Sequence, residues 1–204
     1  MTAEITKLES PIDVMYLIHK ALRVEAARVE QMIERFAITD QLQPFREAFQ
    51  HWEKTLGYHA AVEDKYMTPS LADLPVARDN EAAHEGLEQR LADIQHYVSR
   101  MVGPALATAK TRRHLYGKVV ALRIAQDDHL EEEEAFVLPI IRARIPEAQQ
   151  LEMARYLLID GESSDDGWLI DWVAAALTPV ERQLLTALVA QFREVPIAKE
   201  GFQD

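Results

Sequence analysis

Residues 58–69 read YHAAVEDKYMTP and residues 128–139 read DHLEEEEAFVLP, so one chemical pattern occurs twice in the chain. In each stretch a His is followed by Glu at the fourth position after it, a second acid at the fifth, an aromatic residue at the seventh and Pro at the tenth. Side chains four residues apart lie one turn apart on the same face of an α-helix. His59 with Glu63, and His129 with Glu133, can therefore each present an imidazole and a carboxylate to one point. Two such helices facing each other could hold two metal ions.

The composition limits the ligands that a metal site could use. The chain has 204 residues, enough for one domain with its own core and an appended segment. It contains no Cys, which excludes disulfides, thiolate zinc sites and iron–sulfur clusters held by cysteine. His and carboxylate side chains are left as the strong ligands, so any metal is held by nitrogen and oxygen.

Charge and hydropathy argue against two classes of partner. The formal net charge is −12, whereas nucleic-acid binding normally needs a basic face. No stretch is long and apolar enough to cross a bilayer, and Met1 to Ser10 alternates polar and apolar residues, unlike a secretory signal. We therefore expect a cytoplasmic protein that binds neither nucleic acid nor membranes.

Apolar residues spaced alternately three and four apart predict long helices with one core-facing side. The first begins with Ser10 as N-cap, Pro11 at the first helical position and Asp13 in the first turn, and extends to about Ala37. Its core-facing positions are Met15, His19, Leu22, Ala26, Val29, Ile33 and Phe36.

Three further helices follow from the same spacing. The second ends before Pro69, the third ends at Gly103-Pro104, and the fourth begins near Thr111, with Pro139 expected to kink or end it. The core-facing positions of the second helix are Phe45, Phe49, Trp52, Leu56, His59, Glu63 and Tyr66. Those of the third are His84, Leu87, Leu91, Ile94, Val98 and Met101. Those of the fourth are Leu115, Val119, Leu122, Gln126, His129, Glu133, Phe136 and Ile140. The predicted fold is all-α, an up-down-up-down four-helix bundle with additional C-terminal helices.

Four histidines are expected at one level of this bundle. His19 and His84 lie about eight residues after their helices begin, while His59 and His129 lie about eight and ten residues before theirs end. At 1.5 Å per residue, all four lie roughly 12–15 Å from the same end of an antiparallel bundle. Residues far apart in the sequence thereby converge.

The chain divides into two predicted parts, a di-metal bundle over residues 10–145 and a helical extension over residues 146–204 that packs on it. Thr178-Pro179-Val180-Glu181 opens the last helix as a capping box. Trp168 and Trp172 could anchor a partner or a homodimer, or pack within the chain.

Six polar side chains occupy apolar core positions at this level: His19, His59, Glu63, His84, His129 and Glu133. A single core His is usually a hydrogen-bonded structural residue, and buried His–Glu pairs remain an alternative here. Leaving the six unpaired would cost at least ~1–3 kcal/mol each, and a metal centre satisfies them together. Four imidazoles and two carboxylates fit iron, manganese or zinc, and disfavour calcium and copper(I).

The chain resembles the hemerythrin-like, or HHE cation-binding, domain. The resemblance rests on His19 followed by KALR, on His59 with Glu63, on His84, and on His129 with Glu133, and it covers roughly residues 10–145. It implies two non-haem iron ions with an oxo or hydroxo bridge. On that pattern His19 and His59 bind one iron, His84 and His129 bind the other, and the two glutamates bridge them.

The chain departs from the oxygen-carrying members of that family at two positions. Carriers have a second His four residues after the third-helix His, where this chain has Glu88, and they place the second carboxylate five residues after its His, which here selects Glu134. The core-facing pattern favours Glu133, with Glu134 in reserve, and the rest of the acidic run 127–134 is interpreted as a solvated helix face. Reversible oxygen carriage is therefore not the expected function.

Three functions fit these residues. The leading one is a di-iron protein that binds or reacts with dioxygen, peroxide or nitric oxide, which leaves open whether it is an enzyme. The alternatives are a metal- or oxygen-responsive sensor that signals through its C-terminal helices, and a non-catalytic metal-binding protein. A ferritin-like carboxylate protein is disfavoured because its motif is Glu followed by His three residues later.

Overall fold

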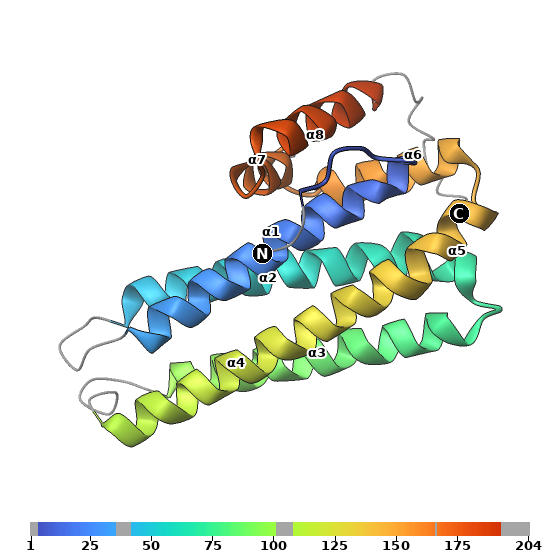
Figure 1. Cartoon of the computed structure of the whole chain (residues 1–204). Helices are drawn as coiled ribbons and strands as arrows, with labels where there is room; N and C mark the ends of the chain where they lie inside the picture. The colour runs from blue at the N-terminus through green and yellow to red at the C-terminus, as the bar shows by residue number, and fades with distance from the viewer. Residues whose placement is uncertain (1–3, 36–41, 101–107, 166, 193–204) are drawn as a thin grey trace.

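The computed structural model describes residues 4–35, 42–100, 108–165 and 167–192, and Figure 1 shows a molecule built of helices. Its body consists of four long helices, α1 (Val14–Glu34), α2 (Gln43–Tyr66), α3 (Pro75–Ser99) and α4 (Ala109–Glu132). Short helical turns η1 (Pro11–Asp13), η2 (Thr68–Leu71) and η4 (Glu133–Val137) adjoin them, and α5 (Leu138–Arg144) continues from η4. No strand occurs in the described ranges, so the all-α prediction is confirmed.

The four long helices pack into a bundle. Helix α1 contacts α2 and α4, and α3 contacts α4 and α2. Among the described residues up to Glu133, every position predicted to face the core is buried except Tyr66, which is partly buried. Phe36 and Met101, together with the predicted helix ends at Ala37 and Gly103-Pro104, lie outside the described residues. The bundle is confirmed, while the strict up-down-up-down order stays a prediction.

The start of α1 is fixed by the buried Asp13. Its carboxylate accepts the backbone N–H groups of Glu9 and Ser10, at 2.6 and 3.1 Å, and the Ser10 hydroxyl at 2.9 Å. Arg142 of α5 donates to the same carboxylate at 2.6 Å. The residues predicted to open the first helix thus form a 3-10 turn before it, and the buried charge ties that turn to the end of the bundle.

The helix containing the second His–Glu pair does not end at Pro139. A five-residue π turn, η4, precedes the proline, and the chain continues as α5 to Arg144. Proline has no N–H and its ring crowds the carbonyl four residues earlier, and a π turn accommodates both. The extra residue in the turn moves the buried face forward by one position, so Phe136 is 61% exposed while Val137 and Ile141 are buried. The prediction of Phe136 as a core residue is therefore wrong.

Three further helices cover one side of the bundle: α6 (Glu147–Leu158), α7 (Trp168–Ala175) and α8 (Pro179–Gln191). Helix α6 contacts α2, and α7 and α8 contact α1. Figure 1 shows the three helices at the top of the view, with α3 at the bottom. Thr178 and Glu181 form the predicted capping box. The fully buried Glu181 carboxylate also accepts two hydrogen bonds from Lys20 of α1, at 2.6 and 2.7 Å. The last helix is thus attached to the bundle through a charge pair.

The two tryptophans of α7 pack within the chain. Trp168 makes edge contacts with His51 and Tyr58, its ring lies 3.7 Å from the ammonium of Lys54, and Trp172 lies against His51. These contacts favour internal packing over an anchor for a partner. The division at residue 145 and the homodimer stay predictions. No helix among the described residues is long and apolar enough to cross a membrane.

Candidate metal centre

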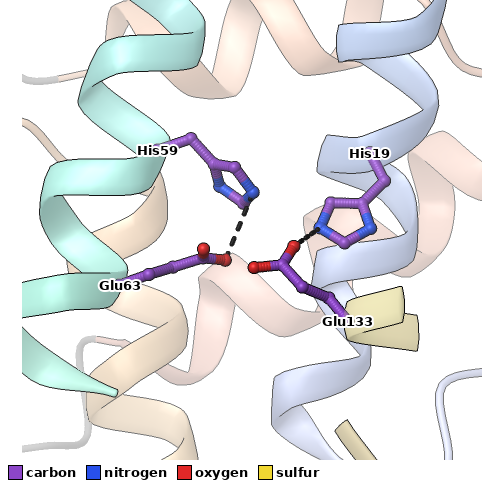
Figure 2. A group of neighbouring side chains, drawn as sticks. All are labelled: His19, His59, Glu63 and Glu133. Atoms are coloured by element: carbon purple, nitrogen blue, oxygen red, sulfur yellow. Dashed lines mark ion pairs between the residues drawn. The ribbon is translucent and has the colours of Figure 1, made fainter. Parts of the chain in front are cut away.

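The structure brings all six predicted site residues together inside the bundle. Helix α1 supplies His19, α2 supplies His59 and Glu63, α3 supplies His84, and α4 with η4 supplies His129 and Glu133. All six side chains are at most 6% exposed. Figure 2 shows one part of the cluster, in which His59 and Glu63 reach from α2 and His19 reaches from α1 toward Glu133.

The cluster divides into two groups that share both glutamates. His19, His59, Glu63 and Glu133 each offer one atom within 4.8 Å of the others, and we call this group the first half-site. His84, His129, Glu63 and Glu133 meet the same criterion and form the second half-site. Each half-site therefore combines two imidazoles with two carboxylates, and each glutamate lies between the two pairs of histidines.

The short distances in the cluster run between imidazole and carboxylate. Nε2 of His59 lies 3.2 Å from Oε1 of Glu63, and Nε2 of His84 lies 3.2 Å from Oε2 of the same residue. Glu133 has the same relation to the other two histidines, with Oε1 3.2 Å from Nε2 of His129 and Oε2 3.3 Å from Nε2 of His19. Each carboxylate thus directs one oxygen to a histidine of each half-site.

Eight buried nitrogen and oxygen atoms that face one another in the cluster have no hydrogen-bond partner among the described residues. They comprise the Nε2 atoms of the four histidines and all four carboxylate oxygens of Glu63 and Glu133. Eight such atoms in one place would be costly, since a buried polar group without a partner costs about 1–3 kcal/mol. Nitrogen and oxygen lone pairs that face one another suit a cation between them, so these residues fit a metal centre.

The two glutamates differ in their protonation. Burial and the adjacent Glu133 raise the pKa of Glu63 well above its ordinary value. Burial also opposes the ionisation of Glu133, but His19 and His84 beside it outweigh burial and hold the pKa well below its usual range. In turn, burial lowers the pKa of His19 and His84, but the carboxylates dominate and raise it to about 9 and about 11. Without metal, the histidines beside Glu133 thus favour its anionic form, and burial favours the neutral form of Glu63.

The other two imidazoles stay neutral. Burial, and then the charge on His19, lower the pKa of His59 well below its ordinary value. Burial also lowers the pKa of His129. Neutral imidazole and ionised carboxylate are the forms that bind metals, so metal binding would displace protons from the remaining groups of the cluster.

A second layer of carboxylates holds two of the imidazoles. Nδ1 of His19 lies 2.9 Å from Glu134, and Nδ1 of His84 lies 2.7 Å from Asp64. Arg23 donates to the same Glu134 oxygen at 2.8 Å. These are the acids at the fifth position of the two repeats. In each repeat, therefore, the acid at the fourth position enters the cluster and the acid at the fifth holds a histidine from another helix.

This arrangement corrects one sequence interpretation. The sequence-based prediction has Glu134 as the alternative ligand to Glu133, next to acids expected on a solvated helix face. In the structure its carboxylate points to Nδ1 of His19, and it belongs to neither half-site. Asp64 was not singled out as a functional residue. The signal that could have found it is the repeat itself, since the fifth position is acidic in both copies.

Glu88 and two tyrosines that lie near proposed ligands in the sequence, Tyr16 and Tyr58, are outside the cluster. Glu88 is exposed on α3, so it takes no part in the site at the position where oxygen carriers have a histidine. Tyr16 accepts a hydrogen bond from Arg142, and Tyr58 donates to the backbone carbonyls of Tyr156 and Ile159. These tyrosines serve packing.

A bundle of four long helices around a buried cluster of four histidines and two glutamates defines a class of protein, the helical metal-binding bundles. Residues 10–141 match the family described as the hemerythrin HHE cation binding domain. That match spans well over half of the chain, so the chain belongs to this family. No curated protein and no solved structure matches it.

Proposed function

We propose that the six clustered side chains hold two iron ions and that the protein binds, or reacts with, a small oxidant there. The observation that carries the proposal is the set of eight buried, unpartnered nitrogen and oxygen atoms that converge at the two half-sites. Such a donor set suits a first-row metal, and the family is one of cation-binding domains. Zinc and manganese are the alternative metals.

The ligands divide between the ions by half-site. His19 and His59 would bind one ion, His84 and His129 the other, and Glu63 and Glu133 would each bridge the two. Each ion would then be held by two imidazoles and by carboxylates shared with the other ion, and the pair would bind the small molecule. A pair of iron ions supplies the electrons that reduce dioxygen or peroxide, and also binds nitric oxide.

The chain's own residues position these ligands and exclude water. Glu134 and Asp64 accept the Nδ1 protons of His19 and His84, which fixes each ring with Nε2 toward the cluster. On the side toward the middle of the bundle lies the buried Gln126, whose carbonyl accepts the indole N–H of Trp52 at 2.7 Å. Apolar residues occupy the core positions beyond this pair, so the site is closed toward the middle of the bundle and its geometry is held from several helices.

Metal analysis of the purified protein tests the proposal. We expect two iron ions per chain, and a clear loss in the His59→Ala variant, because it removes one of the two imidazoles of the first half-site. His51→Ala is the matched control, since His51 also lies on α2 but outside the cluster. Peroxide or nitric oxide should react with the loaded protein. Zinc with no such reaction would instead support a non-catalytic metal site.

A sensor is a second candidate, favoured by where the C-terminal helices attach. Lys20 follows His19 and pairs with Glu181 of α8, while Tyr58 precedes His59 and donates to the carbonyls of Tyr156 and Ile159, at 2.7 and 3.1 Å. Movement of either histidine on metal binding would thus act directly on the extension. In a Trp52→Phe variant, which reports only on the two tryptophans of α7, iron loading should shift the fluorescence. An unchanged spectrum would exclude this route.

Three further parts of the proposal concern the surroundings of the protein. The partner is a small diatomic or peroxide molecule, the location is the cytoplasm, and the protein is able to form a homodimer. Sedimentation of the loaded protein decides the last point, since a monomer at all concentrations would contradict it.

A further inference from the structure

A pocket of about 690 Å³ opens at the surface beside the second half-site. It lies between the first turns of α3 and the segment formed by η4 and α5, and its lining includes Val76, Asp79, His129, Glu133, Phe136 and Ile140. His129 and Glu133 are members of the proposed metal centre. A pocket of about 720 Å³ between α3 and α4 is lined by none of the six. The first pocket therefore reaches from the solvent to the side chains of His129 and Glu133, whose cluster-facing atoms are buried behind the pocket wall.

The π turn shapes this pocket. In a regular helix Phe136 would follow Glu133 on the core-facing side and would cover it. The extra residue of η4 turns Phe136 outward, where it is 61% exposed and lines the pocket wall, and it turns Val137 inward. π turns often occur at functional sites, where they redirect side chains. Here the turn opens the path to Glu133 and His129.

The pocket favours the second half-site over the first. Of the four histidines only His129 lines it, and His19 and His59 do not. Both half-sites have two imidazoles, since the position one turn after His84 is the exposed Glu88, so the pocket alone distinguishes them. The second half-site is thus the one approached from the solvent.

The charge of the lining selects among small molecules. Asp79, Glu132 and Glu133 are acidic, and no Lys or Arg is among the described residues that line the pocket. Acidic groups at a pocket mouth repel anions, while the side chains of Val76, Phe136 and Ile140 offer an apolar wall. The pocket volume of about 690 Å³ is many times the roughly 30 Å³ that one water molecule occupies in the liquid. An organic hydroperoxide therefore also fits.

We propose that this pocket is the entrance through which a small neutral molecule reaches the proposed metal centre, at the His84–His129 half-site. The proposal deepens the function given above and rests on it for the metal, but the pocket wall that includes His129 is formed by the chain alone. A chemical probe of His129 in the metal-free protein therefore tests the entrance independently of iron binding.

The first experiment modifies imidazoles with diethyl pyrocarbonate in the metal-free protein and follows each histidine by mass spectrometry. We expect His129 to react well before His59, and Ala135→Trp, which fills the pocket mouth, to slow His129 at least tenfold. Ala82→Trp is the matched control, because Ala82 is an exposed alanine of α3 that is not part of the lining. The exposed His96 reports that the reagent is equally active in all samples. An unchanged rate at His129 in Ala135→Trp would overturn the proposal.

The second experiment uses the iron-loaded protein. Nitric oxide should bind at least tenfold more slowly in Ala135→Trp than in wild type or Ala82→Trp, at equal iron content. Raising the ionic strength should speed the binding of azide, an anion, by screening the acidic rim, and should leave the nitric oxide rate unchanged. Equal nitric oxide rates in the three proteins would refute the entrance, and equal salt responses of the two ligands would refute the charge selection. Failure to bind iron would contradict the proposed function alone, since the modification of His129 still decides the entrance.

Discussion

The two acids of the second layer give the sharpest test of how the site is held. Replacing Glu134 by Gln keeps the shape of the side chain but removes the charge that faces Nδ1 of His19 at 2.9 Å. Replacing Asp64 by Asn does the same for His84, at 2.7 Å. Neither residue belongs to a half-site, so each change leaves all six proposed ligands in place.

The expected magnitudes follow from the surroundings of each acid. Losing a carboxylate that orients a ligating histidine typically lowers metal affinity by roughly 10- to 100-fold, or ~1.4–2.7 kcal/mol. The Glu134 side chain is 24% exposed and shares its oxygen with Arg23, whereas that of Asp64 is 41% exposed. Water replaces Asp64 more easily, so we expect Glu134→Gln to reach that range and Asp64→Asn to fall at or below its lower end.

A competition titration with a metal chelator measures these affinities. Glu131→Gln is the matched control because Glu131 is an exposed acid of α4 outside the cluster, and its affinity should equal that of wild type. Two results would refute the reasoning. One is an unchanged affinity in Glu134→Gln, and the other is an equal loss in Glu131→Gln, which would indicate a general effect of net charge.

Three further predictions concern stability. Lys20→Met should lower the free energy of unfolding by about 3 kcal/mol, because it leaves the buried Glu181 carboxylate without its cation. A loss below ~1 kcal/mol in urea unfolding would contradict this. Metal-free protein should lose stability as the pH rises from 6.5 to 9. The pKa of His19 is about 9 when folded against 6.5 when unfolded, so its contribution, up to ~3 kcal/mol, is fully present below pH 6.5 and lost above pH 9. His84, whose pKa is raised to about 11, adds to the decline and continues it beyond pH 9. A His19→Gln variant that declines as steeply as wild type between pH 6.5 and 9 would exclude the contribution of His19. Ile141→Ala should cost ~2–5 kcal/mol and Ile140→Ala clearly less, since the π turn buries Ile141; the reverse order in thermal melts would indicate a regular helix.

Much of the fold follows from the three-four spacing of apolar residues, because that spacing is a local property of each helix. The same spacing carries His19, His59, His84 and His129 inward, and the similar distances of these residues from the helix ends set them at one level. Their convergence therefore needs no knowledge of how the helices pack in detail.

The sequence-based predictions fail where one residue changes the register of a helix, or where an acidic side chain contacts a neighbouring helix. Pro139 signals a disturbance, but the choice between a kink, an end and a π turn depends on which side chains then fill the core, and Val137 does so in place of Phe136. Glu134 and Asp64 lie beside core positions, so spacing alone cannot distinguish a solvated acid from one that meets a histidine of a neighbouring helix. Only the packing of the helices determines that contact.

The central claim is that the duplicated His–Glu pattern builds one site for two metal ions shared through Glu63 and Glu133. Metal analysis of a Glu63→Gln variant beside wild type tests it most directly, with Glu88→Gln as the control from an exposed acid. We predict two irons per chain in wild type and control, and weakened binding of both ions in Glu63→Gln because both half-sites use that carboxylate. A variant that kept both ions, or lost only one with the other unaffected, would contradict it.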